Sequence, residues 1–348
     1  MIKTTYTVFA LFVAILSYAQ IPAYYNGVDL SLTGMPLKDE LASKITTTHT
    51  NQITYTQVWT VLKSSDLDPT NSANVLLVYG FSDTDGNETT DRSRNKNANG
   101  GATTGEWNRE HIYAKSLGTP DLGTSGPGSD AHNLKPADVD NNGTRGNKKF
   151  ASGTGNGGVA GANWYPGDEW KGDIARIVMY MYVRYTTQCK PGNVAVGNPV
   201  AIDLNMVDLL LTWNIEDPVN AYERNRNDVI YNTQGNRNPF IDNPYLATLI
   251  WGGTAAENTW SELGIEEEVL KLSIYPNPTT NGVVYLSFND HNLINIIDIY
   301  DISGKVVKAI TKENISSNKF KIDNLNHGVY FVKISTNLGV LTKKIIVR

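Results

Sequence analysis

NREHIYAKS, residues 108–116, places a carboxylate, Glu110, directly before an imidazole, His111, with an arginine in front of both. A second polar stretch, SDAHNLKPADVDNNGTRGNKKF, follows at residues 129–150 and contains another histidine, His132. The chain has 348 residues but only five histidines. Two of them therefore fall in stretches too polar to form a core, which indicates a chemical site.

The residue types in these two stretches suit phosphodiester chemistry. A histidine such as His111 accepts a proton near neutral pH, because its unperturbed pKa is about 6.5. The carboxylate of Glu110 and an amide oxygen are the hard ligands that Mg²⁺ prefers. Neighbouring strand residues point to opposite faces, so Glu110 and His111 share one site only if the strand ends or bends there. Arg145, Lys148 and Lys149 supply donors for phosphate oxygens, and the set as a whole indicates phosphodiester hydrolysis.

The segments around these stretches predict an α+β fold. Residues 55–69, YTQVWTVLKSSDLDP, have helical spacing and end at Asp-Pro, and residues 73–83, ANVLLVYGFSD, read as a buried strand. Residues 170–185, WKGDIARIVMYMYVRY, predict a long and largely buried helix. Short strands beside dominant helices are typical of the α+β class.

The two ends of the chain predict export. Residues 1–19 combine a lysine, a short apolar run and a small-residue cleavage signal, as in a secretory signal peptide. The composition changes near residue 265, and we expect a linker at 266–275 before a small all-β sandwich at 276–348, where apolar residues alternate between turns. Cys189 is the one cysteine, so no internal disulfide forms.

Four spaced motifs in the C-terminal region are YPNP at 275–278, IYDISGKVV at 299–307, LNHGVYFVKI at 325–334 and KKIIVR at 343–348. Together they resemble the type A C-terminal sorting domain of the type IX secretion system. The resemblance implies a protein that is secreted or held at the cell surface and that has the type IX secretion machinery as a partner. It also implies a tail that is usually cleaved and a mature chain without a transmembrane anchor.

The two polar stretches, with KGDIARIVMYMYVRY at 171–185 and EDPVNAYERNRNDVIYNTQGNRNPFIDNP at 216–244, resemble the endonuclease I family of secreted and periplasmic bacterial nucleases. The resemblance implies a ββα-metal nuclease core within a mainly helical domain at 20–265. It implies His111 as general base, Glu110 and Asn142 as ligands of a single Mg²⁺, and Arg145 as the group that stabilises charge on the phosphate. Mn²⁺ and Ca²⁺ are other ions for such a site.

The same resemblance implies a metal-dependent endonuclease, a hydrolase that cuts DNA, and RNA in some members, with little sequence preference. The products carry 5′-phosphate and 3′-hydroxyl ends. We expect EDTA to abolish the activity and the rate to fall below about pH 6 as His111 takes up a proton. An extracellular ribonuclease on the same scaffold and a non-catalytic surface adhesin are the alternatives.

Each of these residues also has a structural interpretation. In the structural interpretation, His111 only forms a hydrogen bond within the fold, Glu110 is a surface carboxylate, and Arg145 pairs with a carboxylate. Asn142 is then a helix cap or turn residue, with Asn141 and Asn147 as rival ligands. We expect His132 to support a neighbouring loop.

Calcium and zinc sites have less support. Residues 138–143, DVDNNG, imitate the start of an EF-hand loop, but the twelfth position, which needs a bidentate glutamate, is Lys149. Residues 83–91, DTDGNETTD, are a less specific candidate for a calcium-binding loop, and the same composition is also common in ordinary surface loops. There is no HExxH motif and no cysteine cluster for zinc.

The charge balance opposes a nucleic-acid-binding domain. Residues 20–271 contain 20 Lys and Arg against 30 Asp and Glu, a net charge of −10. Nucleic-acid-binding domains usually carry a basic surface. We therefore predict a basic cleft on an acidic body, formed by Arg145, Lys148, Lys149, Arg224, Arg226 and Arg237.

Overall fold

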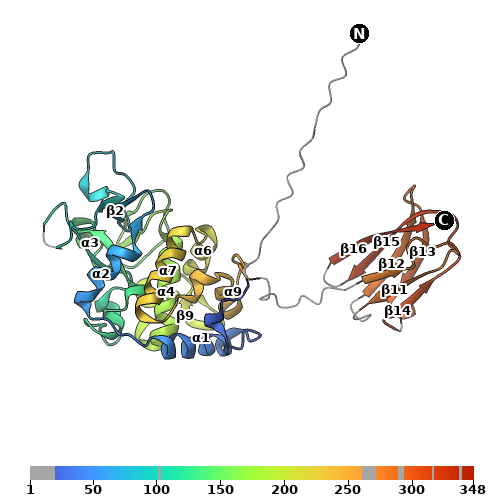
Figure 1. Cartoon of the computed structure of the whole chain (residues 1–348), viewed down its shortest axis with the longest axis horizontal. Coiled ribbons are helices and arrows are strands. Elements are labelled where there is room, and N and C mark those ends of the chain that lie inside the picture. Colours follow the sequence, from blue (N-terminus) through green and yellow to red (C-terminus); the bar gives the residue numbers. More distant parts are fainter. Residues whose placement is uncertain (1–19, 101–102, 261–271, 289–293, 316, 337–338) are drawn as a thin grey trace, which may run out of the picture. The chain divides into compact units, whose positions relative to one another are not determined.

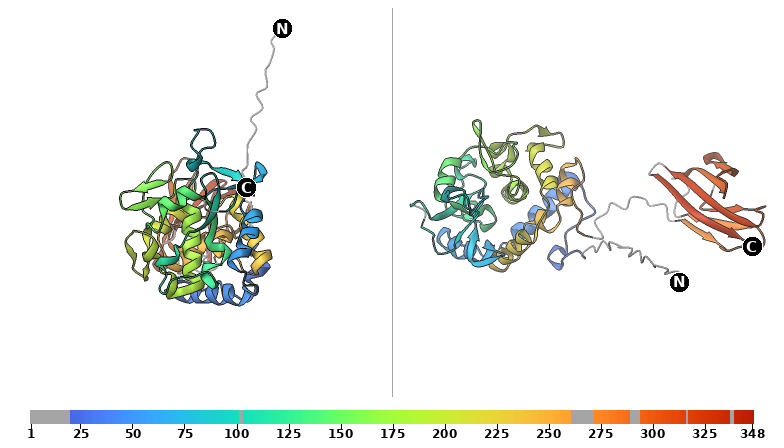
Figure 2. Two further views of the ribbon diagram at one scale, coloured as in Figure 1. Left: turned by 90° about the vertical axis from the view of Figure 1, so that its left-hand side faces the viewer. Right: turned by 90° about the horizontal axis from the view of Figure 1, so that it is seen from above.

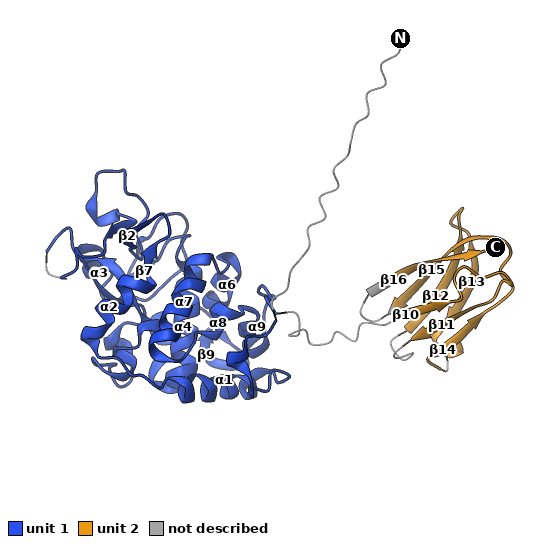
Figure 3. Ribbon diagram, viewed as in Figure 1, with its two compact units in different colours: residues 1–263 blue, residues 264–348 orange. Residues whose placement is uncertain are grey.

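The computed structural model describes residues 20–100, 103–260, 272–288, 294–315, 317–336 and 339–348. The chain divides into two compact units, Met1–Leu263 and Gly264–Arg348 (Figure 3). Unit 1 mixes helices and strands, and the described part of unit 2 is built mainly of strands (Figure 1). The predicted signal peptide, residues 1–19, lies outside the described residues.

Helix α4 (Lys171–Tyr185) carries the core of unit 1. Twelve of its 15 residues are buried, and it packs against α6 and α1. A helix that is buried on nearly every side belongs in a core, so the predicted buried helix is confirmed. The other helices are α1 (Gly34–Thr48), α2 (Tyr55–Ser65), α3 (Val139–Arg145), α5 (Pro191–Val194), α6 (Asp208–Glu216), α7 (Ala221–Gln234), α8 (Pro239–Asp242) and α9 (Tyr245–Trp251).

Helix α2 begins where the sequence predicts it. The Thr54 hydroxyl accepts a hydrogen bond from the backbone N–H of Gln57, and the Gln57 side chain accepts one from the backbone N–H of Thr54. This reciprocal pair forms a capping box, which satisfies two N–H groups at the start of the helix. Val58, Val61 and Leu62 are buried, and α2 packs against α7. The cap fixes the position of Tyr55, the first residue of α2, beside strand β4.

The strands of unit 1 are short and form separate small sheets. These are β1 (Leu67–Asp68), β2 (Asn71–Leu76) and β3 (Ser93–Asn95); β4 (Trp107–His111) and β5 (Leu134–Asp138); β6 (Gly158–Ala160) and β7 (Asn163–Tyr165); and β8 (Pro199–Val200) and β9 (Asp203–Val207). Figures 1 and 2 show β2 and α3 at one end of this unit and α1 and α9 at the other.

Strands β4 and β5 bring the two polar stretches together. They pair antiparallel, with Trp107 opposite Asp138 and His111 opposite Leu134. The carboxylate of Asp138 then caps α3 by accepting hydrogen bonds from the backbone N–H groups of Asp140 and Asn141. An aspartate at this position satisfies N–H groups that the helix leaves free. The chain therefore runs from one strand to the next and directly into a helix.

Unit 2 forms two antiparallel sheets around one apolar core, in the orders β10-β11-β14 and β13-β12-β15-β16. The strands are β10 (Leu272–Tyr275), β11 (Val284–Phe288), β12 (Ile294–Asp301), β13 (Val306–Thr311), β14 (Lys319–Ile322), β15 (Gly328–Thr336) and β16 (Gly339–Val347). The all-β prediction is confirmed. Strand β10 begins inside the segment predicted as linker, 266–275, because Leu272 and Ile274 pack against this core.

The described part of the chain contains no helix with the length and apolar character needed to cross a membrane.

Because each unit has a core of its own, we expect a fragment of residues 20–263 to fold alone. Its thermal midpoint should match the transition of unit 1 in the full chain. Circular dichroism melts of the two proteins test this expectation. A midpoint lower by more than about 4 °C, or about 1 kcal/mol in a unit of this size, would show that the units depend on each other.

Candidate active site

The two faces of strand β4 carry different chemistry. Successive side chains on a strand point to opposite faces, so Asn108 and Glu110 share one face and Arg109 and His111 share the other. The strand ends at His111. Asn108 and Glu110 form hydrogen bonds with side chains of helix α3. Arg109 and His111 instead contact an aromatic ring of helix α2.

Glu110 is nearly buried, with 3% of its surface exposed. Its Oε1 accepts hydrogen bonds from the Tyr79 hydroxyl at 2.8 Å and from Arg145 Nη1 at 2.9 Å. Burial raises the pKa of Glu110, and the positive charge of Arg145 and the hydrogen bond from Tyr79 oppose that rise. Both side-chain donors use Oε1, no described side chain donates to Oε2, and the backbone N–H of His111 also bonds the carboxylate.

Asn142 lies on the face of α3 that meets Asn108 and Glu110. Its Nδ2 donates a hydrogen bond to Asn108 Oδ1 at 2.6 Å, which leaves the Asn142 amide oxygen to accept from, or bind, another group. Asn142 and Arg145 are three residues apart on the helix and therefore share a face. The rival Asn147 comes after the end of α3 and donates to Ser116 Oγ at 3.3 Å. The structure thus brings Asn142, rather than Asn147, to the Glu110 side of β4.

Arg145 is fully buried and ties the end of β4 to α3. Besides Glu110, its guanidinium donates to the backbone carbonyls of His111 and Ile112, each at 3.0 Å. A side chain without exposed surface does not reach a substrate phosphate in this conformation. The expected role in stabilising charge on the phosphate therefore does not fit, and the alternative pairing with a carboxylate is the one observed.

His111 keeps 7% of its surface exposed and stacks on Tyr55, with ring centroids 5.6 Å apart. Its Nε2 lies 2.9 Å from the carbonyl oxygen of Gly128. Because a carbonyl only accepts hydrogen bonds, Nε2 carries the proton and Nδ1 holds the free electron pair. Burial and, to a smaller extent, the nearby cations Lys115, Arg109 and Arg145 lower the pKa of His111 to about 4, against the opposing effect of the hydrogen bond to Gly128. The imidazole is therefore neutral at physiological pH.

His132 is buried away from this arrangement and supports a loop, as expected. Its Nε2 donates to the carbonyl oxygen of Asn236 at 3.2 Å, and its ring packs against Tyr180. The neighbouring Asp130 accepts from the hydroxyls of Tyr180 at 2.7 Å and Tyr185 at 2.9 Å. These bonds fasten the connection between β4 and β5 to helix α4.

Comparison with known proteins identifies the family of this chain. The family model for Endonuclease I matches residues 33–245. The chain belongs to the Endonuclease I family. The family model for the secretion system C-terminal sorting domain matches residues 273–348, which confirms the type IX sorting domain. This member of the family is a nuclease that is secreted or located at the cell surface.

Two curated relatives are both named extracellular ribonuclease. The relative from Bacillus subtilis (strain 168) is 45% identical over 246 residues, which cover 67% of this chain and 80% of the relative. The relative from Bacillus amyloliquefaciens is 44% identical over 231 residues, which cover 63% of this chain and 75% of the relative. Among solved structures, a DUF3244-family β-sandwich protein from Bacteroides vulgatus is 18% identical, covers 24% of this chain and 89% of its own, and has a TM-score of 0.20. At that TM-score the similarity supports no conclusion about the fold.

The predicted basic cleft is wrong for three of its six members, Arg145, Arg226 and Arg237, because carboxylates inside unit 1 pair with them. Arg226 is buried and donates to Asp66 at 3.0 Å, and Arg237 pairs with Asp242 at 2.7 Å and with Asp228 at 2.8 Å. Lys149 donates to the carbonyl oxygen of Gly192 at 2.7 Å. Lys148 and Arg224 likewise donate to backbone carbonyls, those of Thr144 and Val219. A carbonyl does not neutralise a cation, so the place of these three residues in a basic cleft stays a prediction.

The aspartates of the acidic loop at 83–91 already accept hydrogen bonds from nearby residues of the chain. Asp83 accepts hydrogen bonds from the N–H groups of Arg92 and Ser93, and Asp85 accepts from the N–H of Asn87 and from Thr90. Within the described ranges, no three His, Cys, Asp or Glu side chains lie close enough to hold a metal ion. A metal ion bound by the described residues would therefore have fewer than three ligands of these types.

Glu110 and Asn142 fit a Mg²⁺ site of that kind. No described side chain donates to Glu110 Oε2, and Asn142 bonds Asn108 through its Nδ2 and not through its amide oxygen. Mg²⁺ takes oxygen ligands and commonly uses one or two protein groups, with water and substrate phosphate completing the shell. The donor set is therefore of the right chemistry and size.

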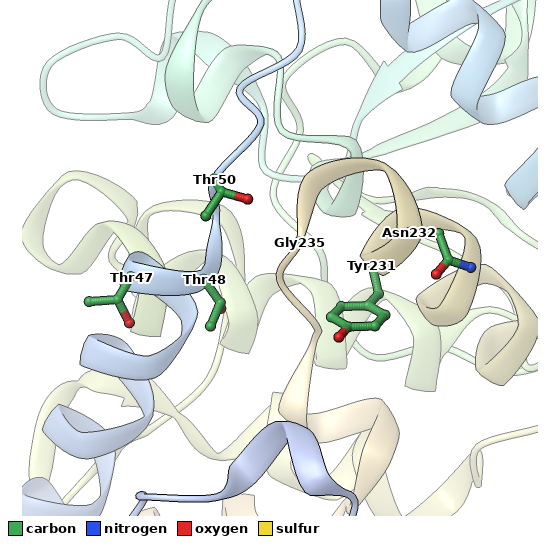
Figure 4. A pocket seen from close by; sticks show the side chains of 6 residues that line it. All are labelled: Thr47, Thr48, Thr50, Tyr231, Asn232 and Gly235. Atoms are coloured by element: carbon green, nitrogen blue, oxygen red, sulfur yellow. The ribbon is translucent and has the colours of Figure 1, made fainter.

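A surface pocket of about 490 Å³ lies between the ends of α1 and α7 and contains none of these site residues (Figure 4). Thr47, Thr48, Thr50, Tyr231, Asn232 and Gly235 line it.

The sequence did not reveal Tyr79, which donates to Glu110. This residue has a backbone φ of 74°, rare for a residue other than glycine, and is fully buried. It comes from the buried stretch after β2, 31 positions before Glu110. No spacing pattern links two residues that meet only through the tertiary fold.

Replacing Arg145 by methionine should leave the Glu110 carboxylate buried without its cation. Removing one partner of a buried ion pair costs about 3–5 kcal/mol of unfolding free energy. Urea denaturation of the 20–263 fragment measures the loss. The double variant Glu110→Gln/Arg145→Met should lose less than Arg145→Met alone, because no charge is then stranded. A loss below about 1 kcal/mol for Arg145→Met would contradict the central role of this pair.

Proposed function

We propose that the enzyme hydrolyses phosphodiester bonds of DNA and RNA, with water as the nucleophile and a divalent metal ion held by Glu110 and Asn142. The observation that carries this proposal is His111, a neutral imidazole whose Nε2 is bonded to the Gly128 carbonyl and whose Nδ1 keeps its electron pair. It stands at the end of the strand that also carries Glu110. A base and an oxygen-ligand site are thus held by one strand.

In the proposed reaction, Nδ1 of His111 takes a proton from a water molecule as that water attacks phosphorus. The Gly128 carbonyl holds the imidazole in the tautomer that this step requires. Arg145 keeps the end of β4 and the Glu110 carboxylate in place. Attack opposite the 3′-oxygen breaks the bond between phosphorus and that oxygen, which takes up a proton from solvent water, so the products carry 5′-phosphate and 3′-hydroxyl ends.

The metal ion, Mg²⁺ in our proposal, would supply positive charge to the phosphate oxygens as negative charge develops there. Glu110 and Asn142 would hold it by one carboxylate oxygen and one amide oxygen. Mn²⁺ and Ca²⁺ accept the same oxygen ligands and are the other ions to test.

The substrate follows from this chemistry. Attack by water does not use the 2′-hydroxyl, so the proposed mechanism serves both DNA and RNA. The relatives are named extracellular ribonuclease, which supports RNA as a substrate. A ribonuclease that used the 2′-hydroxyl as nucleophile would spare DNA and leave cyclic phosphate ends. Cleavage of matched DNA and RNA oligomers, with analysis of the product ends, distinguishes these two candidates.

The domain organisation that we propose follows the function. A signal peptide at 1–19 and a C-terminal sorting domain would direct export by the type IX machinery. The nuclease lies within residues 20–265.

Replacing His111 by alanine should lower kcat by about 10²–10⁴-fold, the usual contribution of a general base. Both DNA and RNA cleavage should fall together, since one base serves both. Steady-state rates with Mg²⁺ test this expectation, and circular dichroism checks the fold. His132→Ala provides no useful control because that residue is buried, so exposed His327 in unit 2 is the matched position for replacement. Unchanged activity in His111→Ala would remove His111 from the mechanism.

The pH dependence should reflect the burial of His111. A base works in its neutral form, so the rate falls as pH drops through its pKa. With the pKa of His111 lowered to about 4, we expect a plateau down to about pH 5, and not the fall below about pH 6 that an unperturbed imidazole predicts. The pH profile of kcat/KM measures this. An acid limb that moves with Mg²⁺ concentration would belong to Glu110, because protons and metal compete there.

A further inference from the structure

The proposed active site lies in an acidic unit, and three of the six cations predicted to contact substrate pair with carboxylates inside it. Arg226 and Arg237 pair with aspartates and Arg145 pairs with Glu110. The question is which cation on the His111 face of β4 remains for the negative backbone of the substrate. Arg109 is on that face, two residues before His111.

Two aromatic rings hold the guanidinium of Arg109 in place. Its Cζ lies 3.5 Å from the ring centroid of Tyr55 and 4.2 Å from that of Trp59. Tyr55 and Trp59 are four residues apart on α2 and therefore point to the same side of the helix. Such contacts favour a cation over the ring face and orient it. Tyr55 also stacks on His111, so one ring positions both side chains.

The charge of Arg109 is not neutralised by a carboxylate. Among the residues that the structure describes, none of its nitrogens forms an ion pair, and its hydrogen bond goes from Nη1 to the backbone carbonyl of Tyr55. Its Nε is buried without a hydrogen-bond partner in the same set of residues. A guanidinium presents five N–H donors, so most of them remain for a ligand. Because Nε is buried, the remaining Nη hydrogens are the ones that a phosphate would contact.

We propose that Arg109 contacts the substrate and binds a phosphate next to the scissile one on the nucleic-acid strand. This inference rests on the proposed function. It adds that the nucleic-acid substrate runs across the face of β4 that carries Arg109 and His111. Arginine suits this task because its planar group donates two parallel hydrogen bonds to phosphate oxygens. The aromatic pair on α2 preorganises it, which lowers the entropy lost on binding.

The test compares Arg109→Met with Arg92→Met as the matched control. Arg92 loses the same charge, but its guanidinium is already paired with Glu169 on the surface. The substrates are a single-stranded 20-mer and a dinucleotide, which has no phosphate beside the scissile one. For Arg109→Met, kcat/KM on the 20-mer should fall about ten- to a hundredfold, the range of a charge-assisted hydrogen bond. The same constant on the dinucleotide should change little.

Salt dependence gives a second readout that a purely structural role would not move. The slope of log kcat/KM against log salt for the 20-mer should become shallower by about 0.7, the value for one lost phosphate contact on a single strand. Arg92→Met should keep the wild-type slope. Arg109→Lys should keep the slope and recover only part of the rate, because lysine retains the charge without the planar pair of donors.

The outcomes separate this inference from the proposed function. Equal losses of kcat/KM on the 20-mer and the dinucleotide, with an unchanged salt slope, would overturn the proposal. Arg109 would then only hold Tyr55 in position. A wild-type enzyme that cuts neither substrate in Mg²⁺ would instead contradict the proposed function itself. Loss on the 20-mer alone, with a shallower slope, supports the contact.

Discussion

The buried ion pair between Arg145 and Glu110 is the interaction on which the candidate site depends. An isolated charge in a protein interior is costly, and pairing with several hydrogen bonds makes it tolerable. Arg145 meets that condition by bonding one carboxylate and two backbone carbonyls at the end of β4. Because all its partners are on or just after β4, the pair fixes α3 against the strand at the residues that the chemistry needs.

That constraint explains how adjacent residues in the sequence take different tasks. Glu110 faces α3, where Asn142 supplies an amide oxygen, and His111 faces α2, where Tyr55 and Arg109 lie. In the account proposed here, the metal ion and the base are separated by the strand itself and converge at its end. The substrate then meets a cation, Arg109, on the same side as the base.

Buried ion pairs recur throughout unit 1. Lys135 pairs with Asp173 at 2.8 Å, Arg176 with Glu223 at 2.7 Å, and Arg226 with Asp66 at 3.0 Å. The single cysteine, Cys189, is free and buried, so no disulfide braces the fold. Buried pairs are weak contributors to net stability, but a partner left alone is strongly unfavourable. They therefore favour one arrangement of the helices and strands over others.

Much of this could be predicted from the sequence. The family, the buried helix α4, strand β4 and the all-β tail followed from local spacing and motifs. Glu110 and His111 were proposed from the motif stretches and Asn142 from the family resemblance, and their roles stay predictions. The place of Arg226 in the basic cleft was wrong because its partner, Asp66, is 160 positions away. For the same reason Tyr79 and Gly128 were missed: they meet Glu110 and His111 only through the tertiary fold.

Measuring metal binding tests most directly whether the two faces of β4 have separate roles, one binding the metal ion and the other carrying the base. Mn²⁺ affinity is measured by electron paramagnetic resonance on the wild type and on Glu110→Gln, Asn142→Ala and His111→Ala. The account predicts that the first two variants lose about tenfold or more in affinity, at least the effect of removing a supporting residue. His111→Ala should keep the wild-type affinity while losing cleavage. Unchanged binding in Glu110→Gln and Asn142→Ala, or lost binding in His111→Ala, would contradict it.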